Sequence, residues 1–372
     1  MRIGINTRLL IAGKMDGIGW FTCESLRLMV KAHPEHEFYF FFDRKPAKEF
    51  LFATNVHPVV LNPPARHPIL WYLFFEWSLR FALKRHHIDL FLSTDGYIPL
   101  RGSIPIVDVI HDLNFEHAQG NLKPSHQWYM THFFPRFARR ADRIATVSEY
   151  SKQDIATTYR IDSKKIDVVY NGSHSHYHPY PASEQQSIRD QFTDGKPYFV
   201  FISTILKRKN LANLLKAFDI IRNQHDVKLV VIGSRIWWQD ELKQAYDTML
   251  HANDVVFLGH IDSEQLSCIL SGAIALTYPS YFEGFGIPII EAFYAETPVI
   301  TSNTTSMPEV AGDAALLIDP HDPKAIADAM CKLLDSEDLC KELIRRGRRQ
   351  REQFSWERTS TLLWDCMMRA IQ

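Results

Sequence analysis

Short apolar runs alternate with amphipathic stretches along the whole chain of 372 residues. This alternation favours α/β layers on parallel sheets, because the connecting helices bury both faces of parallel strands. In the first half, strands are predicted near Arg2–Ile5, Phe38–Phe42, Val59–Leu61, Leu90–Ser93, Ile106–Ile110, Ile144–Val147 and Val168–Tyr170. In the second half, they are predicted near Phe199–Ser203, Lys228–Ile232, Val255–Leu258, Ile274–Tyr278, Val299–Thr301 and Ala315–Ile318. The pattern predicts two doubly wound domains.

A connector of different composition separates the two sets of strands. Residues 173–196 are rich in His, Pro, Ser and Gln and show weak apolar periodicity. Two domains also suit the length, because single cores stop growing near ~250 to 300 residues. We predict an N-terminal domain over residues 1–180, a C-terminal domain over residues 181–355 and a cleft beside the connector. Residues 356–372 predict a last helix, with apolar positions at Leu362, Leu363, Cys366, Met367 and Ile371.

Composition and charge restrict the classes to which this protein can belong. The formal net charge is -1, and a nucleic-acid partner would normally leave a basic excess, so none is expected. The five cysteines are scattered without metal-ligand spacing, and their odd number fits a reducing compartment. The chain opens on a strand pattern without a signal-peptide layout, and its longest uncharged stretch, Gln265–Phe282, contains polar residues and Pro. We therefore expect a cytoplasmic protein.

The stretch Tyr281–Ala292, with the sequence Y-F-E-G-F-G-I-P-I-I-E-A, is the one that points most strongly to a ligand site. Glu283 lies in a loop that Gly284 and Gly286 make permissive, and glycine lets backbone amides approach a ligand closely. Pro288 predicts a helix start immediately afterwards. The unpaired amides of such a start favour a diphosphate.

Two carboxylates frame this predicted helix start. Glu283 precedes it and Glu291 is expected in its first turn, so the pair could face two ends of one ligand. The plainer alternative is that Glu291 only complements the helix dipole and Glu283 is solvated. At an exposed position either role is worth only about 0.3 to 1 kcal/mol.

The stretch resembles the E-x7-E signature of retaining glycosyltransferases of family 4. The similarity covers most of the chain and is strongest from Pro197 to Trp356. In the second half it is carried by Lys207–Asn210, Ala273–Ser280, Thr297–Ile300, Met307–Asp313 and Leu317–Pro320. In the first half it is carried by His111-Asp112, Val147-Ser148 and Asn171-Gly172.

The resemblance implies the GT-B architecture, with two doubly wound Rossmann-like domains, a cleft between them and a last helix that crosses back onto the first domain. It also implies that Glu283 contacts the donor sugar and Glu291 holds the ribose. Arg208 and Lys209 would neutralise the donor diphosphate. The backbone that would hold sugar hydroxyls belongs to Gly284, Phe285, Gly286 and Ile287.

Two positions depart from the family pattern. Many members carry Gly-Arg or Gly-Thr where this chain has Ser203-Thr204, so a donor phosphate contact near Ser203 is absent or moved. Glu296 stands where a glycine usually precedes Thr-Pro-Val. A side chain is therefore tolerated at that turn.

Several candidate residues directly follow predicted strands: His111, Ser148, Arg208, Lys209 and Glu283. Ligands of doubly wound sheets bind outside the carboxyl ends of the strands, so these positions point to a functional edge. Arg208 and Lys209 also precede a helix that Asn210 could cap, which suits a diphosphate by charge and by amide geometry. A solvated pair of loop charges is the alternative.

The N-terminal candidates each have a structural alternative. Gly17 and Gly19 could offer amides to donor phosphate or to an acceptor sugar, or form a bare turn, because the third glycine of G-x-G-x-x-G is missing. His111 could contact the donor sugar, as the resemblance implies, or be a hydrogen-bonded structural residue. Asp112 could orient His111, and Asp112 and Ser148 are candidates for acceptor contacts.

A histidine tract raises the question of a metal. His174, His176 and His178 alternate along the connector, but no Cys or carboxylate completes a ligand set. An Asp-x-Asp metal-diphosphate motif is also absent from the sequence. We therefore predict no metal site and no cofactor.

The segment Pro68–Arg85 has two interpretations. It combines the aromatic residues Trp71, Tyr72, Phe74, Phe75 and Trp77 with the cations Arg80, Lys84 and Arg85. A core helix with a basic exposed end is favoured, because aromatic stripes usually pack inward. The alternative is an interfacial helix that makes peripheral contact with the inner face of the plasma membrane and reaches a lipid-linked acceptor.

The sequence thus predicts a retaining glycosyltransferase that moves a hexose from a nucleotide-diphosphate sugar to a saccharide or lipid-linked saccharide in cell-surface polysaccharide synthesis. Similarity to bacterial mannosyltransferases of polysaccharide and O-antigen assembly makes GDP-mannose the first expectation, ahead of UDP-hexoses. The alternatives are a nucleotide-sugar epimerase or hydrolase of the same fold and a non-catalytic sugar-nucleotide-binding subunit. A dehydrogenase is disfavoured, because no full dinucleotide fingerprint follows the first strand.

Overall fold

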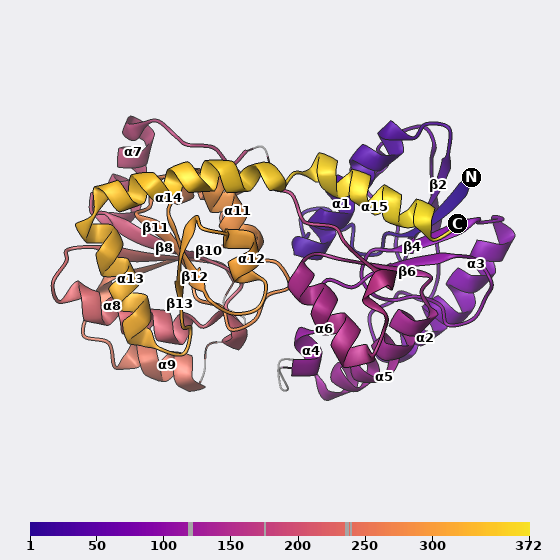
Figure 1. Cartoon of the computed structure of the whole chain (residues 1–372), viewed down its shortest axis with the longest axis horizontal. Helices are drawn as coiled ribbons and strands as arrows, with labels where there is room; N and C mark the ends of the chain where they lie inside the picture. The colour runs from indigo at the N-terminus through magenta and orange to yellow at the C-terminus, as the bar shows by residue number, and fades with distance from the viewer. Residues whose placement is uncertain (118–121, 175, 235–237, 239) are drawn as a thin grey trace. The chain divides into compact units, whose positions relative to one another are not determined.

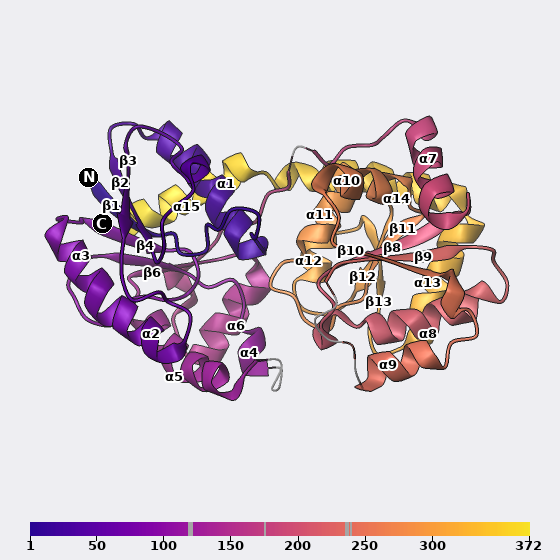
Figure 2. The same ribbon diagram turned by 180° about the vertical axis from the view of Figure 1, so that it is seen from behind.

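The computed structural model describes residues 1–117, 122–174, 176–234, 238 and 240–372 (Figures 1 and 2). The internal contacts divide the chain into two units. Unit 1 consists of Met1–Gly172 with Ser355–Gln372, and unit 2 is Ser173–Phe354. The first boundary therefore lies after Gly172, ahead of the residue 180 predicted from the connector.

Unit 1 is built on a sheet of seven parallel strands in the order β3-β2-β1-β4-β5-β6-β7. The strands are β1 (Arg2–Asn6), β2 (Glu37–Phe42), β3 (Val56–Val60), β4 (Leu90–Ser93), β5 (Ile106–Val109), β6 (Arg143–Thr146) and β7 (Ile166–Val168). The central strands are continuous apolar runs, as expected where helices cover both faces. The predictions for β3 and β7 were displaced by about two residues, because these edge strands are less apolar.

The helices of unit 1 include one that comes from the far end of the chain. They are α1 (Gly17–Ala32), α2 (Pro68–Leu73), α3 (Arg80–Arg85), α4 (Asn114–His117), α5 (Pro124–Arg140), α6 (Glu149–Tyr159) and α15 (Trp356–Arg369), with a π-helical turn at Phe74–Leu79 between α2 and α3. Both views show α15 beside α1. The Trp364 ring stacks on His33 with centroids 3.6 Å apart, and the Thr359 hydroxyl donates to the Tyr170 carbonyl at 2.6 Å.

Unit 2 contains six parallel strands in the order β10-β9-β8-β11-β12-β13. The strands are β8 (Tyr198–Ile202), β9 (Lys228–Ile232), β10 (Val255–Gly259), β11 (Ala275–Tyr278), β12 (Val299–Ser302) and β13 (Ala315–Ile318). The helices are α7 (Ala182–Thr193), α8 (Leu211–Arg222), α9 (Asp240–Asp247), α10 (Ser263–Gly272), α11 (Ile287–Tyr294), α12 (Met307–Ala311), α13 (Pro323–Asp335) and α14 (Glu337–Gln350). The predicted fold class of two doubly wound parallel-sheet domains is confirmed.

Each sheet reverses its strand order at one place, and this place matters for ligand binding. In unit 1 the reversal lies between the neighbours β1 and β4, and in unit 2 between β8 and β11. Connections leave in opposite directions at such a switch point, so the loops at the carboxyl ends of the two strands separate and leave room for a ligand. The loops after β8 and β11 carry Arg208, Lys209 and Glu283.

Candidate functional site

Glu283 is the centre of a buried ionic cluster in unit 2. Its side chain is 8% exposed and accepts from Lys209 Nζ at 2.6 Å and from Arg208 Nη1 at 3.0 Å. Lys209 also donates to the Tyr278 hydroxyl at 2.7 Å, and Arg208 to the Phe282 carbonyl at 3.0 Å. The alternative of solvated loop charges does not hold, because the carboxylate and both cations contact one another inside the unit.

Local backbone structure brings the cations to the carboxylate. After β8 the chain makes a 3-10 turn at Lys207–Lys209, and Asn210 takes a left-handed conformation with φ 59° before α8. The Arg208 carbonyl accepts from the Tyr281 amide at 2.8 Å, which ties the two loops together. Asn210 does not cap α8 as predicted: its side-chain amide donates to the carbonyls of Pro279 and Pro320 at 2.9 and 2.7 Å.

The charges in this cluster fix its ionisation. Burial alone would raise the pKa of Glu283, but the charges of Lys209 and Arg208 outweigh burial and lower this pKa to about 2. Glu283 is therefore ionised at neutral pH. Two cations against one carboxylate leave the cluster with a net positive charge, which suits an incoming anion.

A second loop supports Glu283 from the carboxyl end of β12. The Glu283 amide donates to Thr305 Oγ1 at 3.2 Å, and the Ser306 hydroxyl donates to the Glu283 and Phe285 carbonyls at 2.9 and 3.0 Å. Thr305 has φ 56°, a left-handed backbone that β-branched residues rarely adopt. Such backbone strain is often found at functional sites. No sequence pattern predicted this support.

The helix start after Glu283 offers fewer amides than predicted. Gly286 precedes α11 with φ 103°, a conformation that favours glycine. Pro288 has no N–H, and the Ile289 amide donates to the Gly286 carbonyl at 3.0 Å. Glu291 is the fifth residue of α11 and lies beyond the first turn, so the prediction that it falls in the first turn was wrong, and the plainer alternative of a helix-dipole role there does not hold.

Glu291 has a partner from the connector. Its half-buried carboxyl is hydrogen-bonded to the hydroxyl of Tyr177, a residue 5% exposed. Burial raises the pKa of Glu291 to about 7, and the bond to Tyr177 opposes this rise. The carboxyl thus changes charge near neutral pH, and Tyr177 is a site residue that the sequence analysis missed.

His111 lies after β5 in unit 1. Its Nε2 lies 2.9 Å from the Thr94 carbonyl and must donate to it, so the neutral ring carries its lone pair on Nδ1. Burial lowers the pKa of His111, which keeps the ring neutral at pH 7. Its edge packs against Phe21 with ring centroids 4.9 Å apart. His111 can therefore hold its structural hydrogen bond to Thr94 through Nε2 and still accept a second hydrogen bond at Nδ1.

Three other N-terminal candidates serve local structure. The Gly19 amide donates to Asp16 at 2.9 Å, and a Cβ at Gly19 would lie 3.1 Å from Met15 Cβ. The Asp112 carboxylate accepts from the Asn114 amide at 2.8 Å at the start of α4. Ser148 caps α6 by accepting from the Ser151 amide at 3.0 Å. Gly17 begins α1 and is exposed.

An ion pair that the sequence analysis missed lies at the switch point of unit 1. Arg8 follows β1, Asp95 follows β4, and Arg8 Nε lies 2.6 Å from Asp95 Oδ2. The other Asp95 oxygen accepts from the Asn6 side chain at 2.8 Å, and the Arg8 guanidinium lies 4.5 Å from the Tyr97 ring centroid. The strand-end rule that found His111 applies equally to Arg8 and would have found it.

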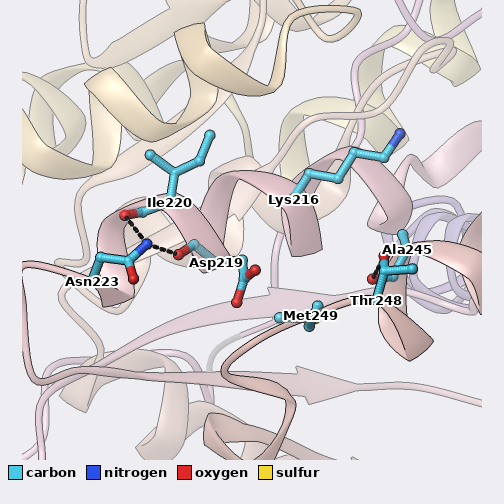
Figure 3. A pocket seen from close by; sticks show the side chains of 7 residues that line it. All are labelled: Lys216, Asp219, Ile220, Asn223, Ala245, Thr248 and Met249. Atoms are coloured by element: carbon cyan, nitrogen blue, oxygen red, sulfur yellow. Dashed lines mark hydrogen bonds between the residues drawn. The ribbon is translucent and has the colours of Figure 1, made fainter.

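The remaining candidate residues of unit 2, Ser203 and the histidines of the connector, make local side-chain contacts. The Ser203 hydroxyl donates to the Thr204 carbonyl at 3.2 Å. The His174 and His176 rings stack with centroids 5.3 Å apart, and within the described residues no group of three metal-ligating side chains is assembled. A pocket of about 280 Å³ lies away from Glu283, between α8 and the C-terminal part of α9 with the residues that follow it (Figure 3). Its lining is Lys216, Asp219, Ile220, Asn223, Ala245, Thr248 and Met249.

Two family models match the chain, one in each half. The model described as Glycosyltransferase Family 4 matches residues 15–175, and the model described as Glycosyl transferases group 1 matches residues 183–350. Together they account for most of the 372 residues. With two parallel-sheet domains and an ionic cluster at a switch point, the chain belongs to the glycosyltransferases of the GT-B class, which confirms the predicted family.

Among curated proteins, the chain is similar to bacterial mannosyltransferases. It is 28% identical over 361 residues to the O-antigen chain mannosyltransferase B of Escherichia coli, an alignment that covers 93% of this chain and 94% of that protein. It is 29% identical over 265 residues to the O-antigen chain mannosyltransferase RfbU of Salmonella typhimurium, covering 71% and 70% of the two chains.

Solved structures share the fold over nearly the whole chain. The sucrose-phosphate synthase of Thermosynechococcus elongatus superposes with a TM-score of 0.79 at 15% identity, covering 99% of this chain and 98% of that one. Anabaena HepE in complex with UDP-glucose superposes with a TM-score of 0.75 at 17% identity, covering 99% and 100%. At these identities the likeness concerns the fold alone.

Proposed function

We propose that this protein is a retaining hexosyltransferase that transfers mannose from GDP-mannose to a saccharide or lipid-linked saccharide in the assembly of a cell-surface polysaccharide. The observation that carries the proposal is the buried cluster of Glu283 with Lys209 and Arg208 at the switch point of unit 2. The names of the relatives, both mannosyltransferases of O-antigen chains, support mannose and polysaccharide assembly.

The cluster fits the electrostatic demand of the reaction. When the glycosidic C–O bond of a sugar nucleotide breaks, negative charge develops on the diphosphate, and preorganised cations lower the barrier by stabilising it. Lys209 and Arg208 are already held by Glu283, so little reorganisation is required. Glu283 would then position the sugar hydroxyls, and the Gly284–Gly286 backbone would approach the sugar. Because the protein supplies the cations, we propose that no metal is required.

Glu291 would hold the ribose of the donor. Its carboxylate can accept from two vicinal hydroxyls, but in this structure it is hydrogen-bonded to Tyr177. Donor binding would therefore compete with or extend this bond. In unit 1, His111 Nδ1 would accept from a hydroxyl of the transferred sugar, with the ring held by Thr94.

Thermal stabilisation by nucleotides tests the site. We expect GDP and GDP-mannose to raise the Tm of the purified protein by several degrees, because binding at 100 times Kd adds about 2.7 kcal/mol, while UDP and UDP-glucose act more weakly. Glu291→Ala should reduce the shift. A larger shift with UDP-glucose would reassign the donor, and no shift with any nucleotide would contradict a donor site.

Product analysis separates the proposal from its alternatives. A hydrolase or epimerase would consume GDP-mannose at the same rate without an acceptor. A non-catalytic subunit would bind it and turn over nothing with any acceptor extract. We expect consumption that depends on acceptor, with the α configuration of the donor retained in the product and with EDTA having no effect.

A further inference from the structure

The helical segment α2, π-turn and α3 of unit 1 has two opposite faces. Its buried face packs into the core of unit 1 through Trp71, Phe74, Phe75, Leu79, Ala82 and Leu83. Its outer face carries Ile69, Leu73, Trp77 and Phe81, which are 66%, 39%, 67% and 69% exposed. The core interpretation of the aromatic segment therefore holds for one set of aromatic residues, while a second set points outward.

The π-turn aligns the outer residues. They recur at every fourth position, and in a continuous α-helix of 3.6 residues per turn such a repeat rotates steadily around the axis. The π-turn Phe74–Leu79 takes more residues per turn and rotates the repeat back. Ile69, Leu73, Trp77 and Phe81 therefore form one apolar stripe along the helix, and isolated exposed apolar residues would not be arranged in this way.

A neighbouring helix extends the same surface. α5 contacts α2, with Tyr72 and Phe133 ring centroids 6.1 Å apart, and Trp128 of α5 is 60% exposed. Figures 1 and 2 show α2, α3 and α5 together at one side of unit 1. The apolar surface thus spans two helices and includes two exposed tryptophans, the side chain most typical of a membrane–water boundary.

The charges around the stripe have one sign. Arg80, Lys84 and Arg85 are exposed, and among the described residues none of the three forms an ion pair. Across residues 66–88 and 122–140, which are described throughout, the one carboxylate is Glu76, which is 7% exposed and accepts from the Leu100 amide. A chain of net charge -1 therefore concentrates cations beside its exposed aromatic stripe.

We propose that this face, formed by α2, the π-turn, α3 and α5, docks on the anionic surface of a lipid bilayer. Apolar side chains enter the headgroup region while the cations contact lipid phosphates, the arrangement of an interfacial amphipathic helix. Within the described residues, no helix is both long and apolar enough to cross a bilayer. Contact at this face would bring unit 1 to a lipid-linked acceptor, a consequence that rests on the proposed transferase function.

Vesicle flotation tests the docking without donor or acceptor, so failure of the transferase proposal leaves its result unaffected. We expect the full chain to float with vesicles of phosphatidylcholine and phosphatidylglycerol at low salt and to remain at the bottom with phosphatidylcholine alone. Trp77→Ser/Phe81→Ser and Arg80→Gln/Lys84→Gln/Arg85→Gln should each lower the vesicle-bound to free ratio at least about tenfold. Both sets of side chains are exposed, so an unchanged Tm should show that folding is retained.

Matched controls come from unit 2. Leu250 is 80% exposed, so Leu250→Ser removes a comparable apolar group elsewhere. Lys243→Gln/Lys341→Gln/Arg345→Gln removes the same charge from side chains that are 57%, 66% and 57% exposed. The controls should float like the wild type. Equal loss in the controls, or no flotation of the wild type, would overturn the proposal. Lipid-free self-association that Trp77→Ser/Phe81→Ser abolishes would instead assign the face to a second copy of the chain.

Discussion

Lys209 Nζ lies 2.6 Å from Glu283 Oε1, and the two residues belong to the loops that follow the neighbouring strands β8 and β11. Unit 1 repeats the arrangement with Arg8 and Asp95, which follow the neighbouring strands β1 and β4 and also lie 2.6 Å apart. In each unit, a cation from the first loop and a carboxylate from the fourth meet where the strand order reverses. The fold itself thus places charged chemistry at the edge where ligands of such sheets bind.

Removal of Lys209 should expose the dependence of Glu283 on its cations. Lys209→Met leaves the buried carboxylate with Arg208 as its cation, so the cost should stay below about 3 to 5 kcal/mol, the range for a buried charge that has lost all compensation. The free energy of unfolding from urea titration measures this cost. Because Glu283→Gln removes the charge that needs compensation, the double variant should lose less than the sum of the single losses. Additivity within about 0.5 kcal/mol would show that the two residues do not interact.

The same cluster should make the protein sensitive to acid. The pKa of Glu283 is about 2 in the folded chain and 4.5 as the reference value, so the stabilisation is present above pH 4.5 and is lost as the pH falls toward 2. The full difference amounts to about 3 kcal/mol. Urea titrations of wild type and Glu283→Gln between pH 6 and pH 3 measure the part of this difference that is lost above pH 3. Parallel curves for the two proteins would contradict the lowered pKa.

Glu291 should make donor binding depend on pH near neutrality. Its folded pKa of about 7 lies above the reference 4.5, so the carboxyl is protonated below pH 7 and loses acceptor capacity for ribose hydroxyls. GDP-mannose should therefore bind more weakly at pH 6 than at pH 8, as titration calorimetry can measure. Its diphosphate diester does not titrate in this range. Glu291→Gln should show a flat profile, and an equally steep profile in that variant would assign the effect to another group.

Burial of Glu291 has an opposite effect on stability. Between pH 4.5 and 7 the folded chain holds this proton more tightly than the unfolded chain, so stability from Glu291 is complete below pH 4.5 and falls as the pH rises through 7. Tyr177→Phe removes the hydrogen bond that favours the ionised form and should raise the pKa of Glu291 further. Nuclear magnetic resonance titration of labelled carboxyls can follow this change. A lower pKa in Tyr177→Phe would contradict the assigned bond.

Two glycines with positive φ should respond differently to alanine. At Gly233, with φ 140°, a Cβ would lie 1.9 Å from the Ser203 carbonyl oxygen, so Gly233→Ala must displace the loop after β8. At Gly13, with φ 67°, an added Cβ would meet no non-neighbouring atom of the described residues within 4 Å, so Gly13→Ala carries only the left-handed backbone cost of about 1 to 2 kcal/mol. We expect Gly233→Ala to lower Tm at least twice as much as Gly13→Ala does. Equal losses would show that the close approach is relieved without cost.

Much of this fold could be predicted from the sequence, because parallel strands that are buried on both faces appear in a sequence as continuous apolar runs. β4 was predicted with its observed bounds, Leu90–Ser93, and the strand-end rule led directly to Arg208, Lys209 and Glu283. The prediction for edge strand β3 was displaced, because two of its five residues are exposed and its apolar run is short.

The side-chain partners could not be predicted in the same way. Tyr177 meets Glu291 only through the folding of unit 2, and no local pattern marks that bond. The π-turn could not be predicted from the spacing of apolar residues alone, because its position depends on how its buried side chains pack on the core. Glu296, which stands where the family usually has glycine, adopts a left-handed backbone with φ 59°. Its carboxylate forms an ion pair with Arg348 at 2.5 Å.

We propose that the Glu283 cluster serves the transfer of mannose from GDP-mannose. The most direct measurement is transfer of radiolabelled mannose from GDP-mannose into a lipid and saccharide extract of the source cells. Wild type should label acceptor, and Glu283→Gln should lower the rate at least about a hundredfold with its fold intact by circular dichroism. Wild-type transfer by Glu283→Gln, or release of free mannose without labelled acceptor, would contradict the account.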